Sequence, residues 1–249
     1  MWRLIVSEGP AEFNMALDEA LLILRNENKI SNTLRLYTFK PSAATIGYFQ
    51  KITEVIDLNY ATKNSIPIVR RITGGGAVYH DQNGEITYSV TAGTDDFPTD
   101  IQKTFENICK GIVYAINELG LEAKFEVIND VIVRGKKVSG SAQTRKNRAL
   151  LQHGTLMYDT DIVTLGKLFK VPKEKLIEHG VSTIFDRVTN LSRELGRIVQ
   201  KQETVNAMAS GFGKAFKTEF LQTSMTDEEA ELAHKIEEKC KSREWNFRR

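Results

Sequence analysis

Residues 70–81 read RRITGGGAVYHD and form the densest signal in the chain. Three consecutive glycines after an apolar strand are costly, because glycine loses more backbone entropy on folding than any other residue. They permit a positive φ and a backbone without Cβ atoms, so amide N–H groups can point at an anion at short range. Arg70 and Arg71 would project to opposite faces of the preceding strand, and one of them would reach a phosphate above the loop. A tight glycine hairpin with surface arginines fits the same spacing.

Residues 129–145, NDVIVRGKKVSGSAQTR, form a second cluster. They predict a short strand, a turn and a returning strand, in which simple alternation puts Lys137 on one face with Ser139 and Ser141. A lysine among small residues leaves space for a ligand, and its compact ammonium is a good counter-charge for phosphate or carboxylate. Asp130 is a candidate to hold a divalent cation or to orient that lysine. A solvated Asp/Lys hairpin is the alternative.

Outward from these clusters, apolar spacing predicts helices and strands in an irregular order. Capping-box patterns at Thr99 and Thr226 predict two helix starts. Because the strand signals gather into hairpin-like runs, with helices between and after them, the sequence predicts an α+β fold with mixed, largely antiparallel sheets. The expected helices are 10–26, 100–119, 161–169, 173–179, 202–217 and 227–240, and the expected strands are 33–38, 43–49, 66–73, 77–80, 85–92, 123–128, 131–134, 136–142 and 149–158.

Composition narrows the function classes. The 249 residues carry 34 Lys+Arg and 32 Asp+Glu, a net charge of +2, so no broad basic face for nucleic acid is expected. Two cysteines make neither a disulfide framework nor a zinc site. The sequence shows no signal peptide and no stretch of ~20 apolar residues, which predicts a cytoplasmic protein without membrane association. Motifs of P-loop NTPases, dinucleotide enzymes, zincins and α/β-hydrolases are also absent from the sequence.

Four strings in order resemble the lipoate–protein ligases, whose superfamily also holds biotin–protein ligases and octanoyltransferases. They are RRITGGGAVYHD (70–81), NDVIV (129–133), GKKVSGSAQ (135–143) and HGTLMYD (153–159). The resemblance implies one biotin/lipoate-ligase-like catalytic domain over residues 1–249. The family's C-terminal accessory domain has no counterpart in the sequence, and in some members it is a separate polypeptide. A small accessory protein is therefore an expected partner for adenylation.

The resemblance implies ATP-dependent, Mg²⁺-assisted activation of lipoate to lipoyl-AMP. The lipoyl group would then pass to a lysine of a lipoyl-domain acceptor, a 2-oxoacid dehydrogenase E2 subunit or the glycine-cleavage H protein. Lys137 would bridge the lipoyl carbonyl and the adenylate phosphate, and Asp130 is the candidate magnesium ligand. By position, the other implied nucleotide and lipoyl-AMP contacts are Arg70, Arg71, Gly75, Gly76, Ala77, Val78, Tyr79, His80, Asn129, Asp130, Gly140, His153 and Gly154.

The physical logic of these positions is charge neutralisation. A carboxylate and a triphosphate repel each other on approach, so fixed positive charge is needed where they meet. Lys137, Arg71 and a magnesium ion would supply it, and the reactive anhydride must be kept from water.

Two alternatives belong to other function classes. Octanoyltransferases of the same superfamily also resemble this chain around SGSAQTR, and they pass the acyl group from a carrier thioester through a cysteine. No cysteine lies in residues 123–134, where that nucleophile is expected, and Cys109 is predicted to be buried and inert. The sequence therefore favours the ligase. A non-catalytic module that binds lipoyl-adenylate or an acceptor domain would need a broken phosphate or lysine motif, and both are intact.

Overall fold

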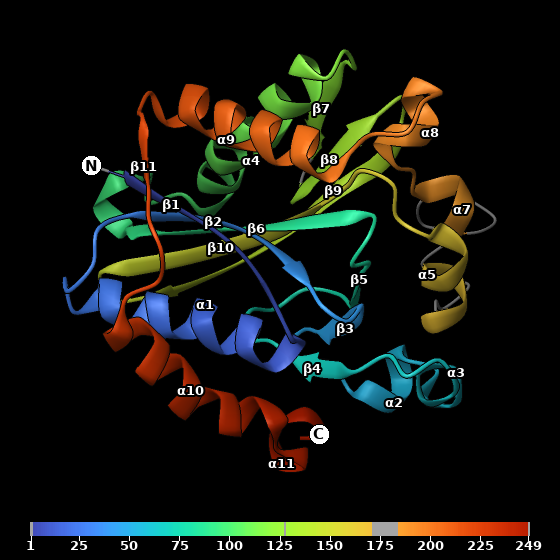
Figure 1. Cartoon of the computed structure of the whole chain (residues 1–249), viewed down its shortest axis with the longest axis horizontal. Coiled ribbons are helices and arrows are strands. Elements are labelled where there is room, and N and C mark those ends of the chain that lie inside the picture. The colour runs from blue at the N-terminus through green and yellow to red at the C-terminus, as the bar shows by residue number, and fades with distance from the viewer. Residues whose placement is uncertain (1, 127, 171–183, 249) are drawn as a thin grey trace.

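The computed structural model describes residues 2–126, 128–170 and 184–248 (Figure 1). Its larger sheet has the strand order β11-β1-β2-β6-β10-β9-β8-β7. β1 pairs in parallel with β11 and β2, and the other pairings of this sheet are antiparallel. The strands are β1 (Trp2–Gly9), β2 (Thr33–Phe39), β6 (Glu85–Gly93), β7 (Ala123–Glu126), β8 (Asp130–Val133), β9 (Lys136–Lys146), β10 (Ala149–Met157) and β11 (Phe220–Gln222).

A smaller sheet carries the glycine run. Its order is β4 (Ile68–Arg70), β3 (Ala43–Ile46) and β5 (Val78–His80), with β3 parallel to β4 and antiparallel to β5. An apolar cluster packs this smaller sheet against three short helices, which are α2 (Ile52–Val55), α3 (Leu58–Lys63) and α5 (Ile162–Leu168). The triple glycine lies between β4 and β5, and Gly75 approaches Ala142 of β9 in the larger sheet.

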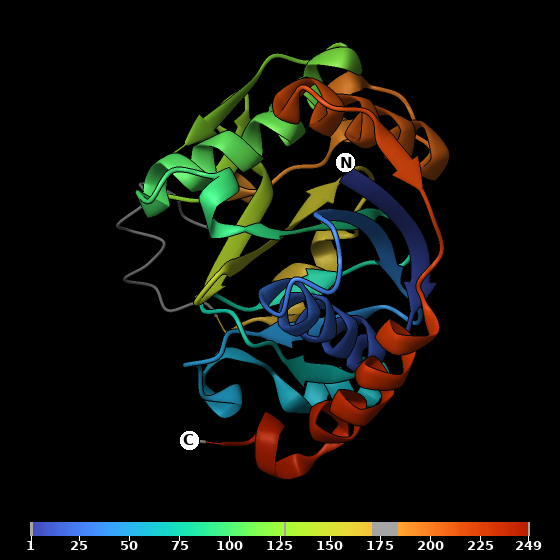
Figure 2. The same ribbon diagram turned by 90° about the vertical axis from the view of Figure 1, so that its left-hand side faces the viewer.

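Helices cover both faces of the larger sheet (Figures 1 and 2). α4 (Ile101–Glu118) and α9 (Lys201–Phe216) lie together on one face, and α1 (Ala11–Asn26) lies on the other with α10 (Asp227–Lys241) packed against it. α4 and α9 approach closely because Gly111 and Gly211 face each other's helix. A Cβ on Gly211 would lie 2.3 Å from the Gly111 carbonyl oxygen. The remaining short elements are η1 (Thr94–Asp96), α7 (Ile184–Arg187), α8 (Leu191–Leu195) and α11 (Arg243–Asn246).

The α+β fold with mixed, largely antiparallel sheets is confirmed. The Thr226 capping box is present, but Asp100, not Thr99, caps α4, because its carboxylate accepts from the Lys103 amide. β1 and β11 were not expected from sequence, and the expected helix 173–179 lies outside the described residues.

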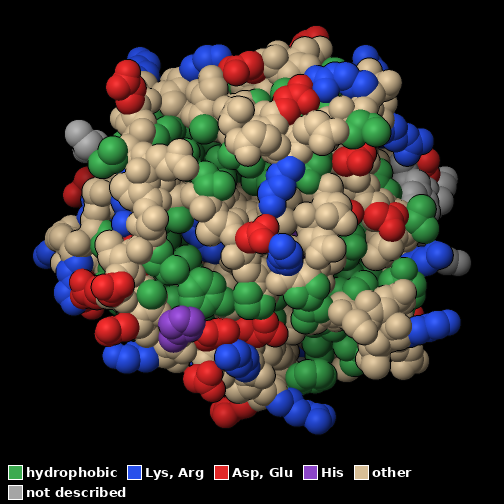
Figure 3. Space-filling view, in the orientation of Figure 1, with side chains coloured by type: hydrophobic (Ala, Val, Ile, Leu, Met, Phe, Trp, Pro, Cys, Tyr) green, Lys and Arg blue, Asp and Glu red, His purple; other side chains and the backbone are tan. Residues whose placement is uncertain are grey.

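Charges of both signs are interspersed over the face shown in Figure 3. Among the described residues, no helix is long and apolar enough to cross a membrane.

Candidate functional site

Gly74, Gly75 and Gly76 form the loop between β4 and β5. Gly75 has a φ of 90°, a conformation in which a side chain is strained, as the sequence predicted. The loop packs closely against Gly47. A Cβ added to Gly47 would lie 2.1 Å from the Gly75 carbonyl oxygen, so this position has no space for a side chain. Gly75 and Gly76 are exposed, and within the described part of the chain their amides donate no hydrogen bond. The loop therefore presents free N–H donors to a ligand.

The buried side chain of Arg71 holds this loop by hydrogen bonds to its carbonyls. Its Nη2 donates to the carbonyls of Gly74 and Gly76, both at 2.7 Å, and its Nε donates to Thr73 Oγ1 at 3.0 Å. Arg71 is 4% exposed, and burial lowers its pKa to about 10, which leaves it charged at neutral pH. The surface-arginine alternative is therefore wrong. The guanidinium is engaged with the loop's own carbonyls, and its phosphate contact stays a prediction.

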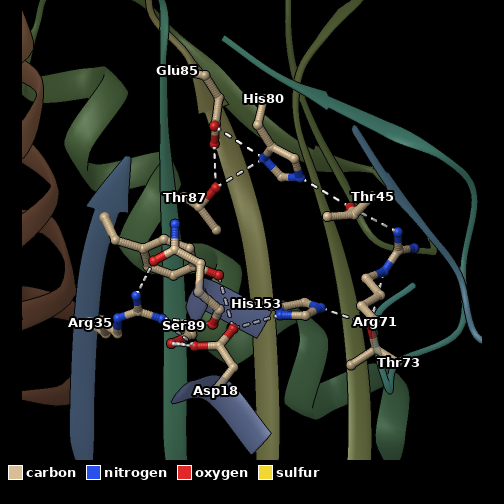
Figure 4. Close-up of polar contacts among 12 residues, drawn as sticks. Asp18, Arg35, Thr45, Arg71, Thr73, His80, Glu85, Thr87, Ser89 and His153 are labelled. Carbon is tan, nitrogen blue, oxygen red and sulfur yellow. Dashed lines mark hydrogen bonds and ion pairs between the residues drawn. The ribbon is translucent and has the colours of Figure 1, made fainter. Parts of the chain in front are cut away.

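His153 links the loop to helix α1 (Figure 4). Its Nε2 lies 2.7 Å from Thr73 Oγ1 and its Nδ1 lies 2.9 Å from Asp18 Oδ2. Burial lowers the pKa of His153, although Asp18 opposes the shift. Burial raises the pKa of Asp18, but the His153 hydrogen bond and the charge of Arg35 more than offset it, so the net shift is downward. A neutral imidazole thus lies between a hydroxyl and a carboxylate.

His80 forms the second arm of the same network. Its Nε2 lies 3.0 Å from Thr45 Oγ1, which also accepts from Arg71, and its Nδ1 lies 3.2 Å from Glu85 Oε2. Burial and the Arg71 charge lower the pKa of His80 to about 3, and burial raises that of Glu85. Phe39 stacks on the imidazole with ring centroids 3.8 Å apart. The His80 imidazole is therefore neutral at neutral pH.

Lys137 lies next to a β-bulge. β8 and β9 pair Val131 with Ser139 and then Ile132 with Lys137, so Val138 has no opposite residue. As a result Lys137 shares a face with Gly140, where a Cβ would lie 2.4 Å from Lys137 Nζ. The predicted alternation, with Lys137 beside Ser139, is wrong because it assumed a regular strand.

Asp130 pairs with two cations. Its Oδ1 lies 2.6 Å from Lys137 Nζ and its Oδ2 lies 3.8 Å from Arg187 Nη2. Its neighbour Asn129 donates from Nδ2 to the Ser141 carbonyl and so ties β8 to β9. The described residues contain no group of three or more His, Cys, Asp or Glu side chains placed to hold a metal ion. Asp130 orients Lys137, and its magnesium role stays a prediction.

The loop and the lysine lie on the same face of the larger sheet. A Cβ on Gly75 would lie 3.7 Å from Ala142 Cβ, two residues after Gly140. His153 pairs with Ala142 across β9 and β10, whereas a Cβ on Gly154 would lie 2.7 Å from Ser141 Oγ, on the face that packs against α4. The two motifs thus meet in space. A hollow of about 350 Å³ lies elsewhere, and no predicted site residue lines it.

Other predicted residues point away from this cluster. Arg70 is fully buried on the opposite side of β4, where it donates to carbonyls of residues 47–50 and of the C-terminal residues 245–248. Tyr79 is buried in the core of the smaller sheet, with Ala77 packed beside that core, and burial raises the Tyr79 pKa to about 12. Val78 pairs with Thr45 in that sheet. The Arg70 and Tyr79 side chains stabilise the scaffold, and their contacts with a nucleotide stay predictions.

Neither cysteine reaches the site. Cys109 lies on α4, on the far side of the sheet, with its Sγ 3.5 Å from Ser141 Oγ. Burial raises its pKa to about 11. Cys240 packs between α10 and α1, and burial raises its pKa to about 12. The expectation of a buried Cys109 is confirmed.

Sequence reasoning missed Asp18, Thr73, Thr45 and Glu85. Thr73 lies inside the quoted glycine motif, and Asp18 is a charged residue within the apolar stripe of α1. A buried charge in an apolar stripe is a signal, because such a group needs a partner. The sequence does not say which partner that is.

A family model described as "Lipoyl protein ligase A/B catalytic domain" matches residues 10–213. Curated relatives match end to end. The octanoyltransferase LipM of Brevibacillus brevis is 34% identical, with 100% of this chain and 99% of that protein covered. The octanoyltransferase LipM of Bacillus subtilis is 33% identical, with 100% and 98% covered.

Solved structures agree on the fold. A bi-partite lipoate protein ligase from Thermoplasma acidophilum, described with its E2 lipoyl domain, superposes with a TM-score of 0.86 at 32% identity, covering 98% of this chain and 95% of that one. A lipoate-protein ligase A bound with ATP gives 0.85 at 30% identity, with 98% of each chain covered.

These relatives correct the functional expectation. The ATP-dependent lipoate ligase was favoured because residues 123–134 lack a cysteine, but the curated relatives that span the whole chain are octanoyltransferases. The reason for the error is chemical. The absent cysteine excludes one way of carrying the acyl group, not the transfer itself.

Proposed function

The chain belongs to the lipoyl protein ligase A/B catalytic-domain family, and from this premise we propose that it transfers an octanoyl group from a carrier-protein thioester to a lysine of a lipoyl domain. The observation that carries the proposal is the end-to-end match to octanoyltransferases at 34% identity. Residues 1–249 act as one catalytic domain, and the reaction needs neither ATP nor Mg²⁺ nor a separate accessory protein. The lipoyl-domain acceptor is supported by the ligase neighbour described with its E2 lipoyl domain.

Lys137 is the proposed catalytic residue. Attack of an amine on a thioester carbonyl develops negative charge on the carbonyl oxygen. The Lys137 ammonium, held by Asp130 over the glycine at 140, offers a fixed positive charge on the same face as the exposed amides of Gly75 and Gly76. Together they can stabilise that oxyanion.

The transfer proceeds without a cysteine acyl-enzyme. Cys109 is buried on the opposite face of the sheet from Lys137, and Cys240 is buried against α1. The neutral amine of the acceptor lysine therefore attacks the thioester carbon directly. The C–N bond forms, the C–S bond breaks, and the carrier thiolate leaves and takes up the proton that the amine loses.

An assay with separate donors tests the reaction. The chain alone is mixed with octanoyl-carrier protein and an acceptor, either an E2 lipoyl domain or a glycine-cleavage H protein, without ATP, and the acceptor mass is measured. The expected result is an octanoyl mass increase, which is absent when the acceptor lysine is replaced by arginine. Modification only with free octanoate or lipoate, ATP and Mg²⁺ would overturn the proposal.

The direct route has its own test. The double variant Cys109→Ala/Cys240→Ala is expected to keep its transfer activity, and intact-mass analysis of the enzyme with donor alone is expected to show no adduct. A stable octanoyl adduct on either cysteine, lost in the corresponding variant, would contradict direct transfer.

A further inference from the structure

The glycine loop depends on one buried cation. Arg71 is the side chain that bonds the carbonyls of Gly74 and Gly76, and these bonds define the direction in which the loop amides point. Within the described residues Arg71 has no carboxylate at ion-pair distance. Its orientation therefore depends on its hydroxyl partners, Thr73 and Thr45.

The hydrogen bonds at Thr73 have a fixed direction. A hydroxyl has one proton, and Thr73 Oγ1 accepts from Arg71 Nε. The pKa of Asp18 is lowered, so its ionised carboxylate can only accept, and His153 Nδ1 donates to it. Nε2 of the neutral imidazole is then an acceptor, and the Thr73 hydroxyl, 2.7 Å away, donates to it.

Asp18 is the fixed end of this chain. It lies on α1 and is 1% exposed. Its Oδ1 accepts from Arg35 Nη1 at 3.0 Å and Ser89 Oγ at 2.8 Å, and its Oδ2 accepts from Tyr37 and from His153. A carboxylate with four donors from three strands, β2, β6 and β10, cannot turn easily, so it fixes the imidazole (Figure 4).

We propose that Asp18 and Thr73 are positioning residues that act through His153 and Arg71 to set the direction of the Gly74–Gly76 amides. The chain runs Asp18, His153, Thr73, Arg71 and the loop carbonyls, and each hydrogen bond fixes the next. The effect on turnover rests on the proposed function, whereas the effect on loop conformation does not.

Thr73→Val removes the hydroxyl at nearly constant volume, and Thr73→Ser keeps it. In Thr73→Val the ¹⁵N–¹H signals of Gly74, Gly75 and Gly76 are expected to shift, while that of the distant Gly111 stays. Transfer kcat/KM is expected to fall about tenfold, the equivalent of ~1.4 kcal/mol for a lost hydrogen bond. Thr73→Ser is expected to restore both. Unchanged loop signals in Thr73→Val would overturn the proposal.

The histidine provides a second signature. ¹⁵N imidazole shifts of the wild-type chain are expected to show His153 neutral with the proton on Nδ1. The opposite tautomer would contradict the proton directions above. If neither the wild-type chain nor any variant transfers an octanoyl group, the proposed function fails. The glycine amide signals and the His153 imidazole shifts still decide whether Thr73 and Asp18 position the loop.

Asp18 is tested against a matched control. Asp18→Asn weakens the bond to His153 and is expected to move the same glycine signals. Ser89→Ala removes a donor from the other carboxylate oxygen and is expected to leave them in place. Equal effects of both variants would mean that the cluster stabilises the core without orienting the loop.

Discussion

At the scale of single residues, the site combines a partly exposed cation with a buried hydrogen-bond network. The Lys137 side chain is 28% exposed and pairs with Asp130, whereas Asp18, His153, Thr73 and Arg71 are all buried. Under the proposed positioning role, chemistry at Lys137 and the exposed loop amides depends on these buried groups. Substitutions in the two parts should have different consequences.

Lys137→Ala is expected to lower kcat/KM for octanoyl transfer by about 30- to 1,000-fold, because an oxyanion donor contributes ~2–4 kcal/mol to the transition state. The unfolding midpoint should change little, since the side chain is partly exposed. Lys136→Ala, at the adjacent position outside the Asp130 ion pair, is the control and should retain activity. Equal activity of both variants in a steady-state assay would show that Lys137 is not catalytic.

His80→Gln tests the buried imidazole by pH. The unfolded chain binds a proton at this residue below about pH 6.5, whereas the folded chain does not until about pH 3. The free energy of unfolding of the wild-type chain therefore falls as pH drops through that window, by up to about 1.4 kcal/mol per pH unit. The variant lacks this loss, so the stability gap between the two proteins should narrow from pH 7 to pH 4.5. Urea unfolding at both values measures it, and parallel curves would contradict it.

At the scale of elements, the loop conformation requires a positive φ at Gly75. Gly75→Ala places a Cβ at a φ of 90° and 3.0 Å from Arg71 Nη2. It is expected to cost ~1–2 kcal/mol of unfolding free energy and to reduce transfer. Gly76→Ala meets nothing within 4 Å and should cost less than half a kcal/mol, which makes it the stability control. Equal losses in chemical denaturation would show that φ is not the cause.

The elements themselves were largely predictable. The apolar stripes of α1 and α4 identified both helices, and the strands of the larger sheet were expected except for β1 and β11. Two features could not be predicted from the sequence. The bulge at Val138 changes which residues face the ligand, and it leaves no mark in the alternation of β9. The parallel pairing of β1 with β2 depends on contacts across residues 10–32 and not on local pattern.

The same limit applies to the candidate site. The glycine loop, Lys137 and Asp130 were predicted from sequence because each lies in a compact motif, whereas the site role of His153 came only from the family resemblance. Asp18 was not, because its contact with His153 joins residues 135 positions apart. Only folding brings such partners together, so a sequence can indicate that a buried charge needs a partner without naming it.

At the scale of the whole molecule, Arg70 joins the C-terminal segment to residues 47–50, which lie beside the glycine loop. Its guanidinium donates to carbonyls of Gly47, Tyr48 and Gln50 on one side and of residues 245, 246 and 248 on the other. The Tyr48 amide in turn donates to the Thr73 carbonyl. The end of the chain is therefore coupled through one buried side chain to the residues beside the triple glycine.

Arg70→Lys tests this coupling, because an ammonium has three donors and cannot span both segments. The carbonyls left without a donor should lower the unfolding free energy by about 3 kcal/mol. Hydrogen exchange at the Tyr48 amide should also accelerate, since the segment that holds it loosens. Arg243→Lys, which loses only a stacking contact with Phe247, should change stability by less than about 0.5 kcal/mol. If the two substitutions are equally mild, Arg70 does not hold the C-terminal segment against the loop at residues 47–50.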